Sequence, residues 1–290
     1  MSHLVRIAAA QYPIDEPSTL QAYLDKISQW VAEAAARADL LVFPEYAGAE
    51  AMAVFGRDIN KNLLQATFEL QTLVPAIDAH MADLARRYGV YILAPSLPVA
   101  AADGSLRNVA TMYGPQGFVG AQRKRVLTPF DKQEWQLTAG EAYTLFITPF
   151  GLIGVAICYD VEFPLQVRAL CEAGATLILC PSCTDSVAGY WRVRLGAMAR
   201  ALENQCVVVQ SPTVGTAEWT TALDVNCGAA GIFAPPDSTL SNDGVLALGE
   251  MDKPQWLYST VNLEDILRLR QHGDVRGFSD WHLQLKSGGG

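Results

Sequence analysis

Histidine is scarce in this sequence, which limits the kinds of catalytic pair it can hold. The 290 residues include four histidines, and none of them directly follows an apolar run of the kind that forms a buried strand. Histidine is the usual general base beside a nucleophilic cysteine. A Cys–His pair is therefore not favoured, and we expect any general base to be a different side chain.

Cysteine is absent from the first half of the chain. The six cysteines lie between Cys158 and Cys227, and in a cytosolic protein of this size they are interpreted as free thiols. Cys180 and Cys183 have the C-x-x-C spacing, but one pair provides half of a zinc site and no second pair completes it. A redox pair would begin a helix, whereas Cys180 ends a run of strand type. We expect no metal site and no cofactor.

Basic residues and long apolar runs are also few. The net charge is −9 and the pI about 4.9, so the basic face that nucleic acids and anionic membranes require is not expected. No apolar run approaches the roughly 20 residues that cross a bilayer. An apolar stretch within Met1–Pro13 is interrupted by Arg6 and has no signal-type cleavage pattern. We expect a cytoplasmic protein without nucleic-acid or membrane partners.

Short strand-type runs alternate with amphipathic helical runs, and half of the residues are hydrophobic. The expected strands are 4–10, 40–43, 90–94, 108–113, 118–123, 143–148, 152–158, 176–180, 206–210, 229–234, 245–248 and 256–261. The expected helices are 19–37, 64–88, 164–173, 190–204 and 263–271. Pro75 lies either near the first turn of helix 64–88 or at a break that divides it. Hairpins mixed with strand–helix units favour mixed sheets with helices outside.

Cys158 occupies the most informative position in the chain, at the end of the apolar run 152–157 and ahead of a helix that begins at Pro164. In open α/β folds, reactive groups lie at the carboxyl ends of strands. A thiol near a helix N-terminus is more easily ionised to the thiolate. The alternative is a buried structural cysteine, because free cysteine is among the most buried residue types. Cys158 alone does not decide between these interpretations.

Two other strand ends carry a charged residue. Glu45 follows the buried run 40–43, and Lys124 follows the run 118–123. A carboxylate directly after a buried strand is costly unless it is paired or functional. Taken singly, Glu45 is equally interpreted as a helix cap or loop carboxylate, and Lys124 as an exposed loop cation. Glu, Lys and Cys at three strand ends, in that order along the chain, form a more specific pattern.

In these segments the sequence resembles the nitrilase superfamily of carbon–nitrogen hydrolases over nearly its whole length. The resemblance rests on Phe43–Glu45, Arg123–Pro129 and Ile157–Pro164, together with Pro181-Ser182, Trp191 and the segment Ala201–Asn204. Gln122 departs from the pattern, since a tyrosine is common two residues before the lysine. The resemblance implies an α/β fold of nitrilase type, a four-layer α-β-β-α sandwich with two mixed sheets.

The resemblance also implies a mechanism based on a Glu–Lys–Cys triad. Glu45 takes the proton of Cys158, and the thiolate attacks a carbonyl carbon. Lys124 and the backbone N–H of Tyr159 stabilise the oxyanion. Glu45 then protonates the leaving amine and activates the water that hydrolyses the thioester. Many members carry a second glutamate beside the lysine, for which Glu134 is our candidate; the loop 128–141 also offers Asp131 and Glu141.

The residues after the nucleophile bear on the substrate. Amidase-like branches of the family tend to have Tyr-Asp there, as at Tyr159-Asp160, so a small carboxamide is favoured over a nitrile. Glu162 stands where several amidase branches carry arginine, so their substrates do not transfer. Candidate substrate-binding residues, each equally interpreted as ordinary packing, are Tyr46, Trp135, Tyr159, Cys183, Thr184 and Trp191. Nitrile hydrolysis, an acyltransferase and a non-catalytic scaffold remain as alternatives.

The resemblance finally implies assembly through helices. We expect a carbon–nitrogen hydrolase domain over residues 1–271, with an arm and tail over 272–290. Helices 164–173 and 190–204 are the candidate surface for a homodimer or a larger even oligomer. Phe278 and Trp281 are too apolar for a free arm. They pack either across a neighbouring subunit or back on their own chain.

Overall fold

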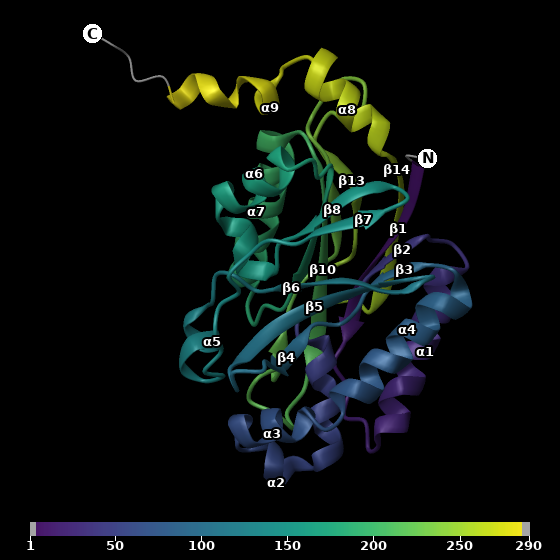
Figure 1. The fold of residues 1–290 in the computed structure, drawn as a ribbon, viewed down its shortest axis with the longest axis vertical. Helices are drawn as coiled ribbons and strands as arrows, with labels where there is room; N and C mark the ends of the chain where they lie inside the picture. Colours follow the sequence, from purple (N-terminus) through teal and green to yellow (C-terminus); the bar gives the residue numbers. More distant parts are fainter. Residues whose placement is uncertain (1–3, 286–290) are drawn as a thin grey trace.

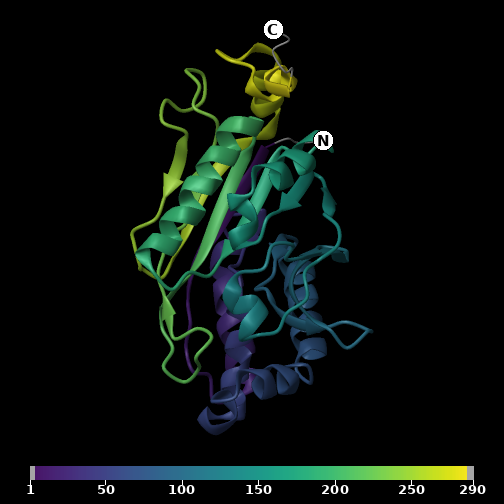
Figure 2. The same ribbon diagram turned by 90° about the vertical axis from the view of Figure 1, so that its left-hand side faces the viewer.

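The structure, a computed structural model that describes residues 4–285, has four layers, with two sheets face to face between helices (Figure 1). Helices α1 (Leu20–Ala35) and α4 (Val74–Tyr88) cover one side, and α6 (Pro164–Glu172) and α7 (Val187–Asn204) cover the other. Figure 2 shows these layers turned by 90°. The sandwich of mixed sheets expected from the sequence is therefore the fold of the chain.

The first sheet is built around β1, whose neighbours on its two sides are β14 and β2. From β2 the sheet continues through β3 to β5, which also pairs with β4 and β6. The pairs β1–β2 and β2–β3 are parallel and the remaining pairs are antiparallel. Its strands are β1 (Leu4–Pro13), β2 (Leu40–Val42), β3 (Tyr91–Leu93), β4 (Leu97–Ala100), β5 (Leu106–Gly114), β6 (Gly117–Arg123) and β14 (Gln255–Asn262).

The second sheet is built around β10, which lies parallel to β9, and β9 lies parallel to β8. Its strands are β7 (Leu145–Thr148), β8 (Gly151–Val155), β9 (Leu177–Ser182), β10 (Val207–Thr216), β11 (Val225–Asn226), β12 (Gly231–Phe233) and β13 (Val245–Leu248). The two sheets are joined where β1 and β10 pair in parallel at Tyr12–Thr213 and Pro13–Val214. Hydrogen bonds between the ends of these two strands therefore join the two sheets of the sandwich.

Alternation along β1 divides the core into two parts, because successive side chains of a strand point to opposite faces. Val5, Ile7 and Ala9 belong to the cluster that fills the space between the sheets and extends under α6 and α7. Ala8, Ala10 and Tyr12 belong to the cluster beneath α1 and α4. β1 is thus buried on both faces, as a central strand of a layered α/β fold should be.

The expected helix 64–88 is divided in two by a turn ahead of Pro75. Helix α3 (Leu63–Leu70) ends first, and Pro75 lies in the first turn of α4, where its missing N–H costs no hydrogen bond. Short helices that were not expected from the sequence include η1 (Ala47–Phe55), α2 (Arg57–Asn60) and α5 (Pro129–Gln133). The last of these contributes to the site described below.

The C-terminal arm packs on its own chain. After α8 (Leu263–His272) come α9 (Gly277–Asp280) and η3 (Trp281–Leu285), at the end of the molecule opposite α2 and α3 (Figure 1). The Arg168 guanidinium lies 4.5 Å from the ring centre of Phe278 and 4.8 Å from that of Trp281. These contacts agree with the expectation that the arm packs back on its own chain. Residues 286–290 of the expected arm and tail lie outside the described residues.

Among residues 4–285, no helix is both long and apolar enough to cross a membrane.

Candidate active site

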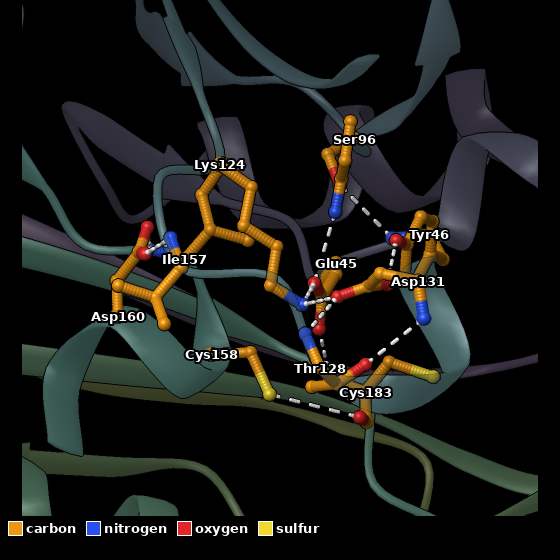
Figure 3. Close-up of polar contacts among 12 residues, drawn as sticks. Glu45, Tyr46, Ser96, Lys124, Thr128, Asp131, Ile157, Cys158, Asp160 and Cys183 are labelled. Carbon is orange, nitrogen blue, oxygen red and sulfur yellow. Dashed lines mark hydrogen bonds and ion pairs between the residues drawn. The ribbon is translucent and has the colours of Figure 1, made fainter. Parts of the chain in front are cut away.

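Strand direction brings Glu45, Lys124 and Cys158 to one edge of the sandwich (Figure 3). β8 and β2 both run parallel to β1 through their neighbours. β6 runs in the same direction as β2, because β5 lies antiparallel to both β3 and β6. The segments that follow β2, β6 and β8 therefore emerge at the same edge and meet there.

Lys124 is the centre of a buried ionic group. Its Nζ lies 2.8 Å from Glu45 Oε1 and 2.7 Å from Asp131 Oδ2, and all three side chains are at most 2% exposed. Asn108 Nδ2 donates to the same Glu45 oxygen at 2.9 Å, and the backbone N–H of Cys183 donates to Glu45 Oε2 at 3.1 Å. Both oxygens of Glu45 are thus held in place.

Burial tunes Glu45 for proton transfer. Loss of solvent raises the pKa of Glu45 to about 7, with a further rise from Asp131, against the lowering effects of Lys124 and of a contact with Cys158. Burial would by itself lower the pKa of Lys124, but Glu45 and Asp131 raise it above its usual value. At neutral pH the lysine is a cation and the glutamate exchanges its proton readily, which suits a residue that acts as both acid and base.

Cys158 does not end a strand, as expected, but begins the short helix η2 (Cys158–Glu162) three residues beyond β8. Its φ of 48° lies in the left-handed region, and its Sγ donates to the carbonyl oxygen of Cys183 at 3.7 Å. Burial raises the pKa of the Cys158 thiol well above its usual range, and the nearby Glu45 raises it further. Burial therefore opposes the thiolate that a nearby helix N-terminus was expected to favour.

Asp160 ties the turn that carries Cys158 to the segment that follows Lys124. Its carboxylate accepts from the N–H groups of Ile157 at 3.1 Å, Val126 at 2.7 Å and Arg125 at 3.2 Å. Burial raises the pKa of Asp160 to about 6, against these hydrogen bonds. In the sequence Asp160 is only a clue to the substrate, whereas in the structure it holds two strand ends together.

The second carboxylate beside Lys124 is Asp131 and not Glu134. Asp131 is the third residue of α5, where it forms a capping box with Thr128, and it accepts a hydrogen bond from the hydroxyl of Tyr46. Although burial opposes it, Lys124 lowers the pKa of Asp131. Glu134 caps the other end of α5 and is exposed. Side chains three residues apart share one face of a continuous helix, but Glu134 lies just beyond the last residue of α5, where that relation no longer holds its side chain beside Lys124.

Asp131→Asn should lower turnover and also move the acid limb of kcat/KM to lower pH. The acid limb reports the ionisation of Glu45, whose carboxylate must be free to take a proton. The charge of Asp131 raises the pKa of Glu45, so its removal lowers that pKa and activity begins at lower pH. Measured pH profiles test this, with Glu134→Gln as the matched control that leaves the profile unchanged. If the pH profile moved in Glu134→Gln and stayed unchanged in Asp131→Asn, the assignment of Asp131 as the second carboxylate would be wrong.

A cavity of about 520 Å³ opens beside this group. Five of the six expected substrate-binding residues line it, namely Tyr46, Trp135, Tyr159, Cys183 and Thr184. Trp191 does not; its side chain is 44% exposed, and the adjacent Arg192 lines the cavity in its place. Charged lining residues that the sequence analysis did not propose for binding are Glu162, Asp185, Arg192 and Asp224.

Tyr46 and Trp135 form the wall beside Asp131. Tyr46 also has a left-handed backbone, with φ 57°, and its N–H donates to Ser96 Oγ at 3.0 Å. Its ring lies 4.1 Å from that of Trp135, whose Nε1 donates to Thr67 Oγ1 at 3.0 Å. The wall is thus rigid. Within residues 4–285, no group of three or more His, Cys, Asp or Glu side chains is placed to hold a metal ion.

The chain is similar to known proteins over most of its length. Residues 6–247 match the carbon–nitrogen hydrolase family. The probable hydrolase YhcX of Bacillus subtilis is 32% identical over 97% of this chain and 55% of its own length. A deaminated glutathione amidase of Yersinia enterocolitica is 31% identical over 46% of this chain and 50% of its own. The chain thus spans about half the length of these curated relatives.

Solved structures share the fold at lower identity. A carbon–nitrogen hydrolase of Helicobacter pylori has a TM-score of 0.76 and 17% identity, over 99% of this chain and 96% of that one. Nit3 of Saccharomyces cerevisiae, a nitrilase superfamily member, has a TM-score of 0.73 and 19% identity, over 92% and 93%. The family match covers most of the chain, and the fold is that of these proteins. The chain therefore belongs to the carbon–nitrogen hydrolase family.

Proposed function

We propose that this protein is a cysteine-dependent amidase that converts a small carboxamide and water to a carboxylic acid and ammonia through a thioester. The observation that carries the proposal is the buried contact of Lys124 with Glu45, beside the Cys158 thiol in a cavity of about 520 Å³. Cavities of this size hold small molecules. No other component is needed for the chemistry, because these side chains supply the nucleophile, the base and the cation.

In the acylation step, Glu45 accepts the thiol proton of Cys158 as Sγ bonds to the carbonyl carbon. Negative charge then develops on the carbonyl oxygen. Two N–H bonds of the Lys124 ammonium are directed to Glu45 and Asp131, so one remains for the oxyanion, together with the backbone N–H of Tyr159. Donors fixed in advance in a dry site stabilise such charge far better than water does.

In the second half of the reaction, the proton held by Glu45 passes to the leaving nitrogen, and the C–N bond breaks to release ammonia. Glu45 is then a carboxylate again and takes a proton from a water molecule that attacks the thioester. The thiol is regenerated when the C–S bond breaks. A pKa of about 7 for Glu45 supports both roles, since neither protonation state is strongly disfavoured near neutral pH.

Ammonia release from a panel of amides, nitriles and carbamyl compounds tests the substrate class. We expect hydrolysis of a small carboxamide at a rate well above that of any nitrile, with acid and ammonia formed in equal amounts. Preferential hydrolysis of the nitrile would overturn the amide assignment. Product in which an added amine replaces water would indicate an acyltransferase, and inactivity toward all three classes would favour a non-catalytic scaffold.

We further propose a homodimer or a larger even oligomer that forms through α6 and α7. Support comes from an exposed apolar stripe at spacings of four and seven residues on α7, composed of Val187, Trp191, Leu195 and Leu202. Leu165 on α6 is 71% exposed beside it. Monomeric proteins rarely expose a contiguous apolar surface of this kind. Such packing would brace η2, which contacts α7 and carries Cys158.

Truncation after Gln271 is expected to weaken assembly and activity together. The shortened chain lacks Phe278 and Trp281, which cover Arg168 on α6, so α6 loses support next to the proposed interface. Light scattering and turnover measured on the same samples check this, with a chain that ends at Leu285 as the control. A full-length protein that is monomeric at micromolar concentration and fully active would contradict the assembly proposal.

A further inference from the structure

The cavity carries more negative charge than the catalytic group requires. Besides Glu45, Asp131 and Lys124, its lining includes three carboxylates and one arginine, namely Glu162, Asp185, Asp224 and Arg192. These residues come from the end of η2, from the segment between β9 and α7, from the segment before β11 and from α7 itself. Acidic groups from three separate parts of the chain therefore face one cavity.

The single arginine is already paired. Arg192 Nε lies 3.8 Å from Glu162 Oε1. Among residues 4–285, no cationic side chain lies within 4.0 Å of Asp185 or Asp224. The Lys124 ammonium is shared by two carboxylates and adds no surplus positive charge. A negatively charged group of a substrate in this cavity would be repelled by Asp185 and Asp224. Neither cationic side chain of the cavity is free to offset that repulsion.

The cavity wall is also partly apolar, with Phe130, Val193, Ala222 and Val225 in its lining. An aliphatic chain in contact with such side chains is removed from water, and the low dielectric of the wall strengthens the field of the carboxylates. The catalytic residues of the cavity are buried, whereas Asp185 and Asp224 are exposed. The cavity therefore suits a molecule with an amide at one end, an apolar stem and a cation at the other.

We propose that the site selects amides whose remote end is positively charged, such as an ammonium or guanidinium group. This inference rests on the proposed amidase function for its reaction but not for its binding preference. Asp185 and Asp224 attract the cation, and Glu162 withholds Arg192 from any anionic substrate. An amide with a remote carboxylate is repelled by the same groups.

A matched series of amides tests the preference. 5-Aminopentanamide, hexanamide and the monoamide of adipic acid share one four-carbon stem and differ in the charge of the far end. We expect kcat/KM to fall in that order, with a difference of about tenfold or more between the cation and the anion at low salt, which narrows as salt is added. A neutral or anionic amide that is processed as well as the cation would overturn the proposal.

Binding to the Cys158→Ala variant separates this proposal from the proposed reaction. Calorimetric titration with the three amides needs no turnover, so the order of affinity is measured even if none is hydrolysed. Tightest binding of 5-aminopentanamide supports the charge preference, and equal or reversed affinity refutes it. If none of the three amides were hydrolysed but their affinities kept the expected order, the result would count against the amidase function and not against the charge preference.

Substitutions in the cavity wall test which residues cause the preference for a cationic amide. In the Asp185→Asn/Asp224→Asn double variant the advantage of the cationic amide should fall severalfold. In Glu162→Gln the freed Arg192 should raise kcat/KM for the anionic amide. Asp265→Asn on α8, a partly exposed carboxylate outside the cavity, is the control and should leave all three values unchanged. An unchanged preference in both wall variants would contradict the assignment.

Discussion

Replacement of Cys158 with alanine should reduce amide turnover by ~10⁴-fold or more, because removal of a nucleophile leaves only the contribution of binding and oxyanion stabilisation. The fold should persist, since alanine is smaller, apolar and compatible with a buried site. The thiol makes a single hydrogen bond, to the carbonyl of Cys183, so little is lost from the native state. Steady-state kinetics and thermal unfolding, measured side by side, check both expectations.

Cys183→Ala is the matched control for this variant. Cys183 lines the same cavity, yet it contacts Glu45 and Cys158 through its backbone N–H and carbonyl, which alanine retains. Turnover should therefore remain within a few-fold of the wild-type value. If Cys183→Ala were inactive and Cys158→Ala active, the nucleophile would be Cys183 and the proposed mechanism would be wrong.

Lys124→Met should lower both kcat and stability. Loss of one oxyanion donor costs on the order of a hundredfold or more in kcat. In this fold the cost extends further, because Glu45 and Asp131 are left buried beside each other without a cation. Breaking a buried ion pair by removal of one partner destabilises a protein by about 3–5 kcal/mol.

The comparison of kcat with KM identifies the role of Lys124. A fall in kcat with little change in KM is expected for a group that acts in the transition state. Lys132→Met is the control, because Lys132 is exposed on α5, next to Asp131 in the chain. Near-normal kcat with only a higher KM in Lys124→Met would make the lysine a binding residue.

The central residues of the site could be found in the sequence because each closely follows a strand. Glu45 and Lys124 lie within three residues of the ends of β2 and β6, and apolar runs mark such strands clearly. Strands that run in one direction end at one edge, so three separate segments converge without any knowledge of the loops. Cys158 was located on the same argument, although a short turn intervenes between it and β8.

The residues that were misplaced lie on or beside helices. Asp131 lies on α5 and Glu134 just beyond its last residue, and Trp191 and Arg192 share α7. In each case the segment was expected near the site, but its own sequence did not determine which of its side chains faces the site. Helix phase depends on packing against the sheet, and α5 has too few residues to show an amphipathic period. The raised pKa of Cys158 was also not expected, because burial outweighs the effect of a nearby helix N-terminus.

The formation of a thioester on Cys158 is the most direct test of the account. A p-nitrophenyl ester of a small acid makes acylation fast, so that the acyl-enzyme accumulates and is captured by rapid acid quench and peptide mass mapping. We expect the acyl group on the peptide that contains Cys158, and no adduct in Cys158→Ala. An acyl group on Cys183 or on another side chain, with Cys158 unmodified in an active protein, would contradict the mechanism.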